Sequence, residues 1–399
     1  MKNSLTVFAL FILAILFQGC GEIKNPVDTN ETEDLQKGGA NKIFVCNEAE
    51  LYAAVNDPAN SGKKILLSEG TYVLSVNDPS GNPWPNGGRL EFQEDMSLSG
   101  VPNNRSAVII DASGLPNSSF VVPSGKTGPI RIGRGKNTIK WLTIVGNELA
   151  AGGIETDLTG TPTTEIKVAH VVSGGSLRGI DVRNIGATMI GRRIDAEIVD
   201  NECFGIVEGI RIVNTNGANQ AQIYAELRNN RAHDFYFGII VNNNRCTSSM
   251  VEVTSYGDRF EGNGLGALIA GGTAGSGTCI SNSTTFESHG SKFINNNGPI
   301  EPDLGDAGGI LVLGADAFGP YMTFSNTVMV RLWGTKVYGN QNIDFQAFGS
   351  RSVANPPVLG GTENHAVIEL YGTSKWIDVV STNSLPEDPN NTNTVTVVR

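Results

Sequence analysis

Acidic and basic side chains recur in short segments that each begin with glycine. They are "GIETD" from Gly153, "GIDVR" from Gly179 and "GIRIV" from Gly209. If these segments are neighbouring parallel strands, they lie about 4.8 Å apart and alternate residues point outward. The outward side chains then form one charged patch, made of Glu155, Asp157, Asp181, Arg183 and Arg211.

Clustered carboxylates raise the pKa of one member, which is what an acid–base pair requires. The same cluster is also suited to Ca²⁺, which takes oxygen ligands. The patch is therefore the candidate catalytic site. The alternative is that its members form cross-strand ion pairs on a solvated face.

A second phrase places an aromatic residue or His before a Gly and a basic residue shortly after it. It occurs as "SYGDRF", "SHGSKF", "LWGTKV" and "LYGTSKW". We expect its outward residues to form an aromatic row and a basic row, with ligand-binding candidates Tyr256, Arg259, His289, Lys292, Trp333, Lys336, Tyr371 and Lys375. Aromatic rings beside cations suit a sugar ring that carries a carboxylate. Alternatively, the rings cover the pleat and the cations pair with Glu on adjacent strands.

The glycine-led segments return about every 26 to 30 residues over the middle of the chain. Repeats of this period indicate stacked structural units. Short strands with Asn and Gly corners are compatible with a sandwich, a propeller or a solenoid. One strand phrase per unit favours the solenoid, in which each coil stacks its strands on those of the next. Asn at the corners can hydrogen-bond its counterpart one coil away.

The segment before the repeats predicts a short amphipathic helix. Asn47 is suited to cap it, with Glu50 three residues later as the capping-box partner. Ala49, Leu51 and Val55 would face the coils. Such a helix would cover the first open edge of a solenoid.

The stretches "ELYAAV…KKILLSEGTYVLS" and "MSLSGVPNNRSAVIIDAS" resemble the opening of right-handed parallel β-helix proteins of the pectin lyase-like superfamily, and the likeness runs from about residue 42 to near residue 380. It implies an all-β solenoid with a short N-terminal capping helix. The superfamily includes polysaccharide lyases, glycoside hydrolases, epimerases and proteins without known activity. Its pectate lyases use Ca²⁺ and a basic residue, commonly Arg; by that analogy Glu155, Asp157 and Asp181 would be ligands, with Arg183 or Arg211 the base. No catalytic motif of the family matches residue by residue.

The N-terminus predicts export. Lys2 precedes an apolar run from Leu5 to Phe17, and Gly19–Cys20 follows. This pattern resembles a bacterial lipoprotein signal with Cys20 as the lipidated residue. We expect a signal peptide over 1–19, the lipidated Cys and a flexible tether over 20–40, the β-helix domain over 41–385 and a tail over 386–399. The lipid would be the only membrane anchor, at the bacterial outer membrane or cell surface.

Four other cysteines are present, without a C-x-x-C pair, which argues against a zinc site. Cys246 and Cys279 follow equivalent strands in consecutive coils, so we expect a disulfide between them.

The formal net charge of −11 argues against nucleic acid as a partner. The hypothesis that follows is a surface-anchored β-helix that binds polysaccharide or another extended glycan. One alternative is a lyase or hydrolase acting on an acidic polysaccharide, with Ca²⁺ as the only cofactor to expect. Another is an envelope protein that is structural or binds a protein partner. The oligomeric state stays open.

Overall fold

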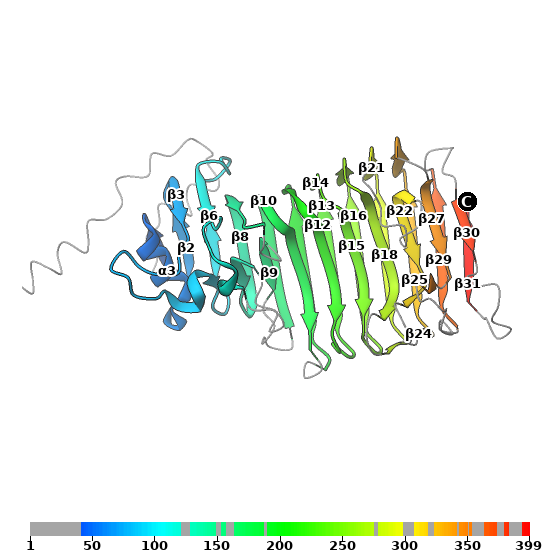
Figure 1. The fold of residues 1–399 in the computed structure, drawn as a ribbon, viewed down its shortest axis with the longest axis horizontal. Helices are drawn as coiled ribbons and strands as arrows, with labels where there is room; N and C mark the ends of the chain where they lie inside the picture. Colours follow the sequence, from blue (N-terminus) through cyan, green and yellow to red (C-terminus); the bar gives the residue numbers. More distant parts are fainter. Residues whose placement is uncertain are drawn as a thin grey trace, which may run out of the picture.

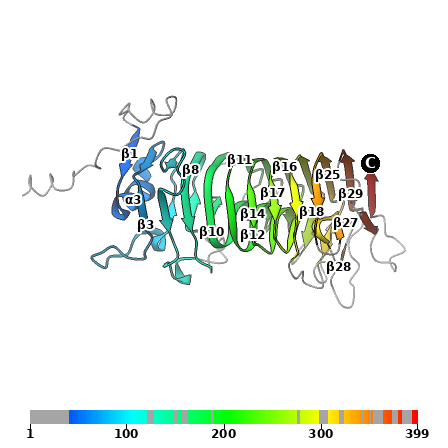
Figure 2. The ribbon, with the colours of Figure 1, turned by 90° about the horizontal axis from the view of Figure 1, so that it is seen from above.

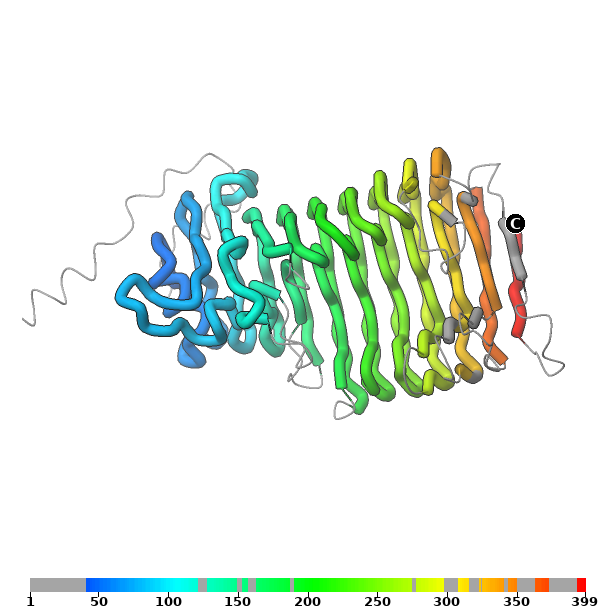
Figure 3. The backbone as a smooth tube through the Cα atoms, in the orientation of Figure 1, coloured from blue at the N-terminus to red at the C-terminus, as the bar shows by residue number. Residues whose placement is uncertain are grey.

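The computed structural model describes residues 41–120, 128–148, 153–156, 163–186, 190–274, 278–297, 307–317, 323–340, 343–349, 351–352, 363–372, 379–382 and 393–399. These residues form an elongated solenoid, with the N-terminal coils at one end and the C-terminus at the other (Figure 1; Figure 3). The named strands pair in parallel, each with its equivalent one coil away. The predicted right-handed parallel β-helix is therefore confirmed.

The parallel pairings run along the axis in three series, joined at the corners by long strands, and we call these series sheets 1, 2 and 3 in chain order. Three long strands bend through the corners: β8 (Gly135–Val145) joins sheets 1 and 2, β10 (Thr163–Ile185) joins all three, and β12 (Glu202–Thr215) joins sheets 2 and 3.

The other strands of sheet 1 are β1 (Lys42–Val45), β2 (Lys64–Leu67), β5 (Ser97–Ser99), β11 (Arg193–Val199), β13 (Gln222–Arg228), β16 (Met250–Tyr256), β20 (Ser283–His289), β25 (Thr327–Trp333), β29 (His365–Tyr371) and β31 (Thr394–Val398). In Figure 2, β1, β11, β16, β25 and β29 follow one another along one edge of the solenoid. Those of sheet 2 are β3 (Gly70–Val73), β6 (Val108–Asp111), β14 (Arg231–His233), β17 (Arg259–Glu261), β21 (Lys292–Ile294) and β26 (Lys336–Tyr338).

Those of sheet 3 are β4 (Leu90–Glu91), β7 (Ile130–Ile132), β9 (Ile154–Thr156), β15 (Phe237–Asn244), β18 (Leu265–Ala274), β22 (Ala307–Leu313), β27 (Ile343–Phe348) and β30 (Val379–Thr382), extended by β23 (Asp316–Ala317) and β28 (Arg351–Ser352). Beside it, β19 (Cys279–Ile280) pairs with β24 (Thr323–Phe324).

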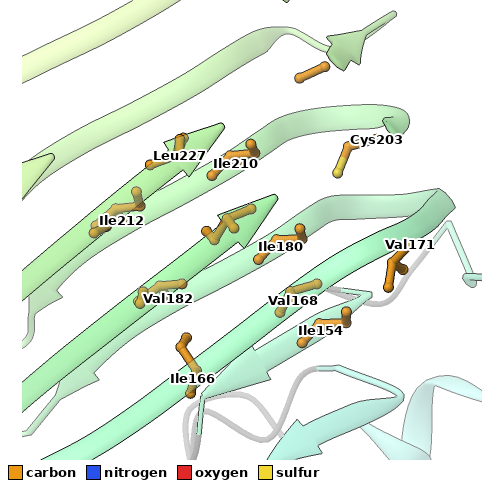
Figure 4. Packing of buried hydrophobic residues seen from close by; sticks show 14 of the residues in the cluster. Ile154, Ile166, Val168, Val171, Ile180, Val182, Cys203, Ile210, Ile212 and Leu227 are labelled. Atoms are coloured by element: carbon orange, nitrogen blue, oxygen red, sulfur yellow. The ribbon is translucent and has the colours of Figure 1, made fainter. Parts of the chain in front are cut away.

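The core fills the inside of the coils with one aliphatic residue above another. Ile154, Ile180 and Ile210 are in register on consecutive coils, and all three are buried. Figure 4 shows these three residues and their neighbours pointing into the solenoid. Because every coil repeats the same strand, the core continues along the whole axis instead of closing into a sphere.

Matched by their apolar positions, the repeats predict that Leu268 lies inside the solenoid between Ile239 and Ile310, and this alignment is wrong by one residue. Ala267, not Leu268, pairs with Ile239 and then with Ile310, so Leu268 points outward and Ile269 inward. The sequence "GALIAG" is apolar in both registers, so its pattern does not select between them. A one-residue slip in a strand exchanges the inner and outer faces.

Rows of buried Asn side chains join the coils at the corners, as expected. One row runs Asn282, Asn326, Asn364 and Asn393, in which each side-chain amide donates to the next Oδ1 at 2.9, 2.9 and 3.1 Å. Because each of the first three also donates to a backbone carbonyl of a neighbouring coil, the corner backbone stays hydrogen-bonded away from water.

Helix α3 (Glu48–Asn56) lies at the N-terminal end of the solenoid (Figure 1). Asn47 Oδ1 accepts from Glu50 N at 3.0 Å, and Glu50 Oε2 accepts from the backbone of the residue before Asn47 at 2.8 Å. Leu51 and Val55 are buried as expected, whereas Ala49 is exposed. The short 3₁₀ helices are η1 (Pro58–Asn60), η2 (Pro85–Gly88) and η3 (Asn117–Ser119).

Candidate functional site

The charged patch expected on the early coils is assembled, and it is buried. Asp181 lies in register between Glu155 and Arg211. Arg183 Nη2 donates to Glu155 Oε2 at 2.6 Å, and Arg183 Nε lies 3.2 Å from Asp181 Oδ2. Glu155 is 0% exposed and Asp181 1% exposed, so the expectation of a solvated face is wrong. Asp157 lies outside the described residues.

Further charged residues extend the patch into a larger network: Arg89, Glu91, Arg131, Arg178 and Glu208. Arg89, the residue after η2, contacts Glu91 at 2.7 Å and lies 3.8 Å from Glu155. These residues come from β4, β7 and the corners before the sheet 3 strands. The glycine-led segments of the sequence therefore did not reveal them. Arg131 pairs in register with Glu155, and Glu91 pairs in register with Arg131, so the strand register identifies both.

Arginines compensate the buried carboxylate at the centre of this network. Burial raises the pKa of Asp181, but Arg183, Arg211 and Arg178 outweigh it and hold that pKa below its usual value. Burial lowers the pKa of the Arg211 guanidinium. Arg211 Nη1 lies 3.7 Å and Arg178 Nη1 3.8 Å from Asp181 Oδ2.

This arrangement does not fit the catalytic or calcium-binding hypothesis. Calcium takes six to eight oxygen ligands, whereas three guanidinium groups surround the Asp181 carboxylate. Carboxylates as deeply buried as Glu155 and Asp181 also offer a polymer no contact surface. The geometry is that of a structural ion network between coils.

The aromatic row forms as predicted, on the outer face of sheet 1. Tyr256, His289, Trp333 and Tyr371 are in register on consecutive coils. Their ring centroids lie 4.9, 4.5 and 5.4 Å apart, with interplanar angles of 18°, 2° and 11°. Each strand ends at a Gly with positive φ, as at Gly257 (67°), which turns the corner. The rings cover each other's faces, so only the two end rings keep an outer face.

The basic row lies on the outer face of sheet 2, around the corner from the rings. Arg231, Arg259, Lys292 and Lys336 are in register. The two arginines pair with Glu261, and Arg231 also pairs with a second glutamate. Within the described part of the chain Lys292 and Lys336 form no ion pair, and Lys375 lies outside it. The aromatic and basic rows thus belong to different sheet faces.

An open groove of about 660 Å³ runs along the outer face of sheet 1 from β8 to β16. Its lining includes Tyr224, Glu226, Glu252 and Thr254, together with charged residues of the earlier coils. Tyr224 is in register with Glu252 on the next coil, and Glu226 is in register with Thr254. They alternate with buried residues along β13 and β16, but a groove across five coils has no signature in any single stretch of sequence.

Tyr256 closes one end of this groove. It lines the groove and is also the first ring of the aromatic row, with His289 behind it. On its groove side the residue in register is Arg228, which bends away toward Glu197 of the preceding coil at 2.6 Å. One face of the Tyr256 ring is therefore turned toward the groove, while the other is held by His289.

The expected disulfide is not formed. Cys246 and Cys279 are buried free thiols, as is Cys203. The Cys246 Sγ lies 3.0 Å from the carbonyl oxygen of Asn244, and Asn282 Nδ2 donates to the Cys279 Sγ at 3.1 Å. Each sulfur is thus hydrogen-bonded to its surroundings, and the expectation from equivalent strand positions is wrong. The lipidation candidate Cys20 lies outside the described residues.

No family model matches this chain, and no curated protein matches it. Solved structures similar to it include the A-modules of two Azotobacter vinelandii mannuronan C-5 epimerases. The AlgE6 module is 15% identical with a TM-score of 0.44, covering 88% of this chain and 95% of that one. The AlgE4 module is 13% identical with a TM-score of 0.41, covering 91% and 98%.

An alginate lyase from Paenibacillus sp. is 14% identical with a TM-score of 0.27, covering 90% of this chain and 99% of that one. Among the described residues, no helix is long and apolar enough to span a membrane.

Proposed function

We propose that this protein binds an extended glycan along the outer face of sheet 1. The observation that carries the proposal is the groove of about 660 Å³ that ends at the free ring face of Tyr256. Coils repeat about every 4.8 Å, a spacing close to one sugar residue of an extended chain, so each coil can meet successive sugars with the same kind of side chain. Carboxylates and hydroxyls along the floor accept hydrogen bonds from sugar hydroxyls.

Tyr256 supplies the apolar contact. A sugar ring stacks its C–H face on an aromatic face, and Tyr256 is the one ring of its row that both lines the groove and keeps a face turned toward it. Because His289 supports the opposite face, the Tyr256 ring is held in position before the ligand arrives.

The two other functions considered receive less support from the structure. Glu155 and Asp181, the carboxylates that would carry lyase or hydrolase chemistry, are buried and paired with Arg183. The outward apolar residues of sheet 3, suited to a protein partner, form a second buried cluster: Val213, Ile240, Leu265, Leu268, Ala270, Leu311 and Leu313. Glu155, Asp181 and this apolar cluster are therefore closed to a ligand.

The test measures binding of the purified chain to an array of extended glycans and compares two variants. Tyr256→Ala and Tyr371→Ala remove the two end rings of the same row, which are 41% and 42% exposed. Only Tyr256 lines the groove. We expect Tyr256→Ala to weaken retention about tenfold, corresponding to an aromatic contact of roughly 1.5 kcal/mol, and Tyr371→Ala to leave it unchanged. Absence of binding across the array, or equal effects of both variants, would contradict the proposal.

We also propose that the protein is an exported lipoprotein displayed at the bacterial outer membrane or cell surface. The support is the run from Leu5 to Phe17 followed by Gly19 and Cys20. Cys20→Ala should release the chain from the membrane fraction, and mass spectrometry of the N-terminal peptide should find an acylated Cys20 in the parent. An unmodified N-terminus in membrane-bound protein would contradict the proposal.

A further inference from the structure

We infer that the groove selects a glycan carrying protonated amino groups over one carrying carboxylates. This inference rests on the proposed function and names the chemical class of its ligand. The charged residues that line the groove are Lys136, Lys167, Arg228, Glu165, Asp195, Glu197, Glu226 and Glu252. Carboxylates therefore outnumber cations by five to three.

The three cations are already engaged by carboxylates of the groove. Lys136 Nζ lies 3.0 Å from Glu165 Oε2, and Lys167 Nζ lies 3.0 Å from Glu197 Oε2. Arg228 pairs with Glu197 at 2.6 Å. An incoming uronate would have to displace one of these pairs while approaching a surplus of negative charge.

Two of the remaining groove carboxylates, Glu226 and Asp195, are each held by an arginine. Arg228 also holds Glu226, with Nε 3.2 Å from Oε1. Asp195 receives three hydrogen bonds from Arg193, whose guanidinium also lies 4.3 Å from the centre of the Tyr224 ring. These contacts fix Asp195 and Tyr224 in the middle of the groove floor.

Glu252 differs from the other acids. It is exposed, and among the described residues it has no ion-pair or hydrogen-bond partner for its carboxylate. It is in register with Tyr224 and lies on the same strand and face as Tyr256. An ammonium group on a sugar that enters the groove meets an uncommitted carboxylate here. A charge-assisted hydrogen bond between them is stronger than one between neutral groups.

The test titrates the purified full chain with three oligosaccharides of equal length: a deacetylated chitosan oligomer, its N-acetylated counterpart and an oligouronate. We expect the deacetylated oligomer to bind most tightly, the N-acetylated oligomer less tightly and the oligouronate most weakly. Raising the salt concentration should shrink the advantage of the amine because exposed charge pairs are screened. Glu252→Gln should lower affinity for the amine-bearing oligomer about two- to fivefold and leave the acetylated oligomer unaffected, as expected for one exposed ion pair.

Glu69→Gln is the matched control, since it makes the same charge change at an exposed acid outside the groove. Uronate binding as tight as amine binding would overturn the inference while leaving the proposed function intact. An amine preference that Glu252→Gln does not reduce would also overturn it. Failure of all three oligosaccharides to bind a folded chain would instead count against the proposed function itself.

Discussion

The rings of Tyr256 and His289 stack with their centroids 4.9 Å apart and their planes at 18°, across the pairing of β16 with β20. Trp333 stacks on the far side of His289 at 4.5 Å. Tyr256 is therefore held from behind by a ring that does not line the groove. Support of this kind lowers the entropy that Tyr256 loses when a ligand binds.

His289→Ala should weaken glycan binding although His289 lies outside the groove. Removing one stacking partner, worth roughly 0.5–1 kcal/mol, corresponds to about a two- to fivefold loss of affinity by titration calorimetry. Trp333→Ala serves as the control because the contact between Tyr256 and His289 survives it. Equal losses in both variants would mean that the row acts as one structural unit and not through Tyr256.

Asp258 follows Asn201 and Asn230 in a row of buried corner residues, and its carboxyl creates a pH dependence. Asp258 Oδ1 accepts from both the backbone and the side chain of Asn230, at 2.6 and 2.8 Å. Burial, partly offset by these hydrogen bonds and one from Ser255, raises the pKa of Asp258 from 3.8 to about 6. The folded state therefore binds the proton more tightly than the unfolded chain.

The contribution of Asp258 to stability is fully present below about pH 4 and is lost as the pH rises through 6. The loss amounts to about 2–3 kcal/mol. Asp258→Asn should abolish this slope and raise the free energy of unfolding at pH 7, measured by urea titration from pH 4 to 8. Moving the carboxyl one coil, in the double variant Asn230→Asp/Asp258→Asn, should restore the slope. A parent protein without the slope would contradict the prediction.

The sequence predicts the fold because the same residue types return once per coil. The glycines that turn the corner after Tyr256 and Trp333 have φ values of 67° and 57°, and the buried asparagines bond between coils as expected. Where an apolar segment fits two registers, as around Leu268, the pattern alone gives the wrong face.

The site was harder to predict. Alternation within a strand correctly points Glu155 and Asp181 out of the coil, but it says nothing of whether that outer face is itself covered. The groove depends on residues one coil apart, such as Tyr224 and Glu252, which are not neighbours in sequence. Only the register of the strands brings them together.

The thiols should be inert in the folded protein. Burial raises the pKa of Cys203 to about 12 and raises the pKa values of Cys246 and Cys279 as well. A thiol reagent should therefore label none of the three in the native chain and all three in urea without reductant, with peptide mass spectrometry assigning each label. A disulfide between Cys246 and Cys279 would leave both unlabelled in urea.

Substitution of Asp181 tests whether this residue has a structural or a catalytic role. Asp181→Asn leaves three arginines beside a neutral amide, and breaking a buried ion pair in this way typically costs about 3–5 kcal/mol. We expect a loss of that size in the free energy of unfolding at pH 7. Since the arginines lower the pKa of Asp181, its contribution is present above the ordinary value of 3.8 and is lost as the pH falls through the folded pKa.

Glu165→Gln gives the matched comparison, because it breaks the pair with Lys136 at the surface, where both side chains are well exposed. Exposed pairs contribute about 0–1 kcal/mol, so this variant should unfold near the parent midpoint. A catalytic acid in an open site would give the opposite result for Asp181, with lost activity and unchanged stability. Because the charge of Asp181 lies between buried arginines, its removal should lower the free energy of unfolding. Glycan binding by the fraction of the protein that stays folded should persist.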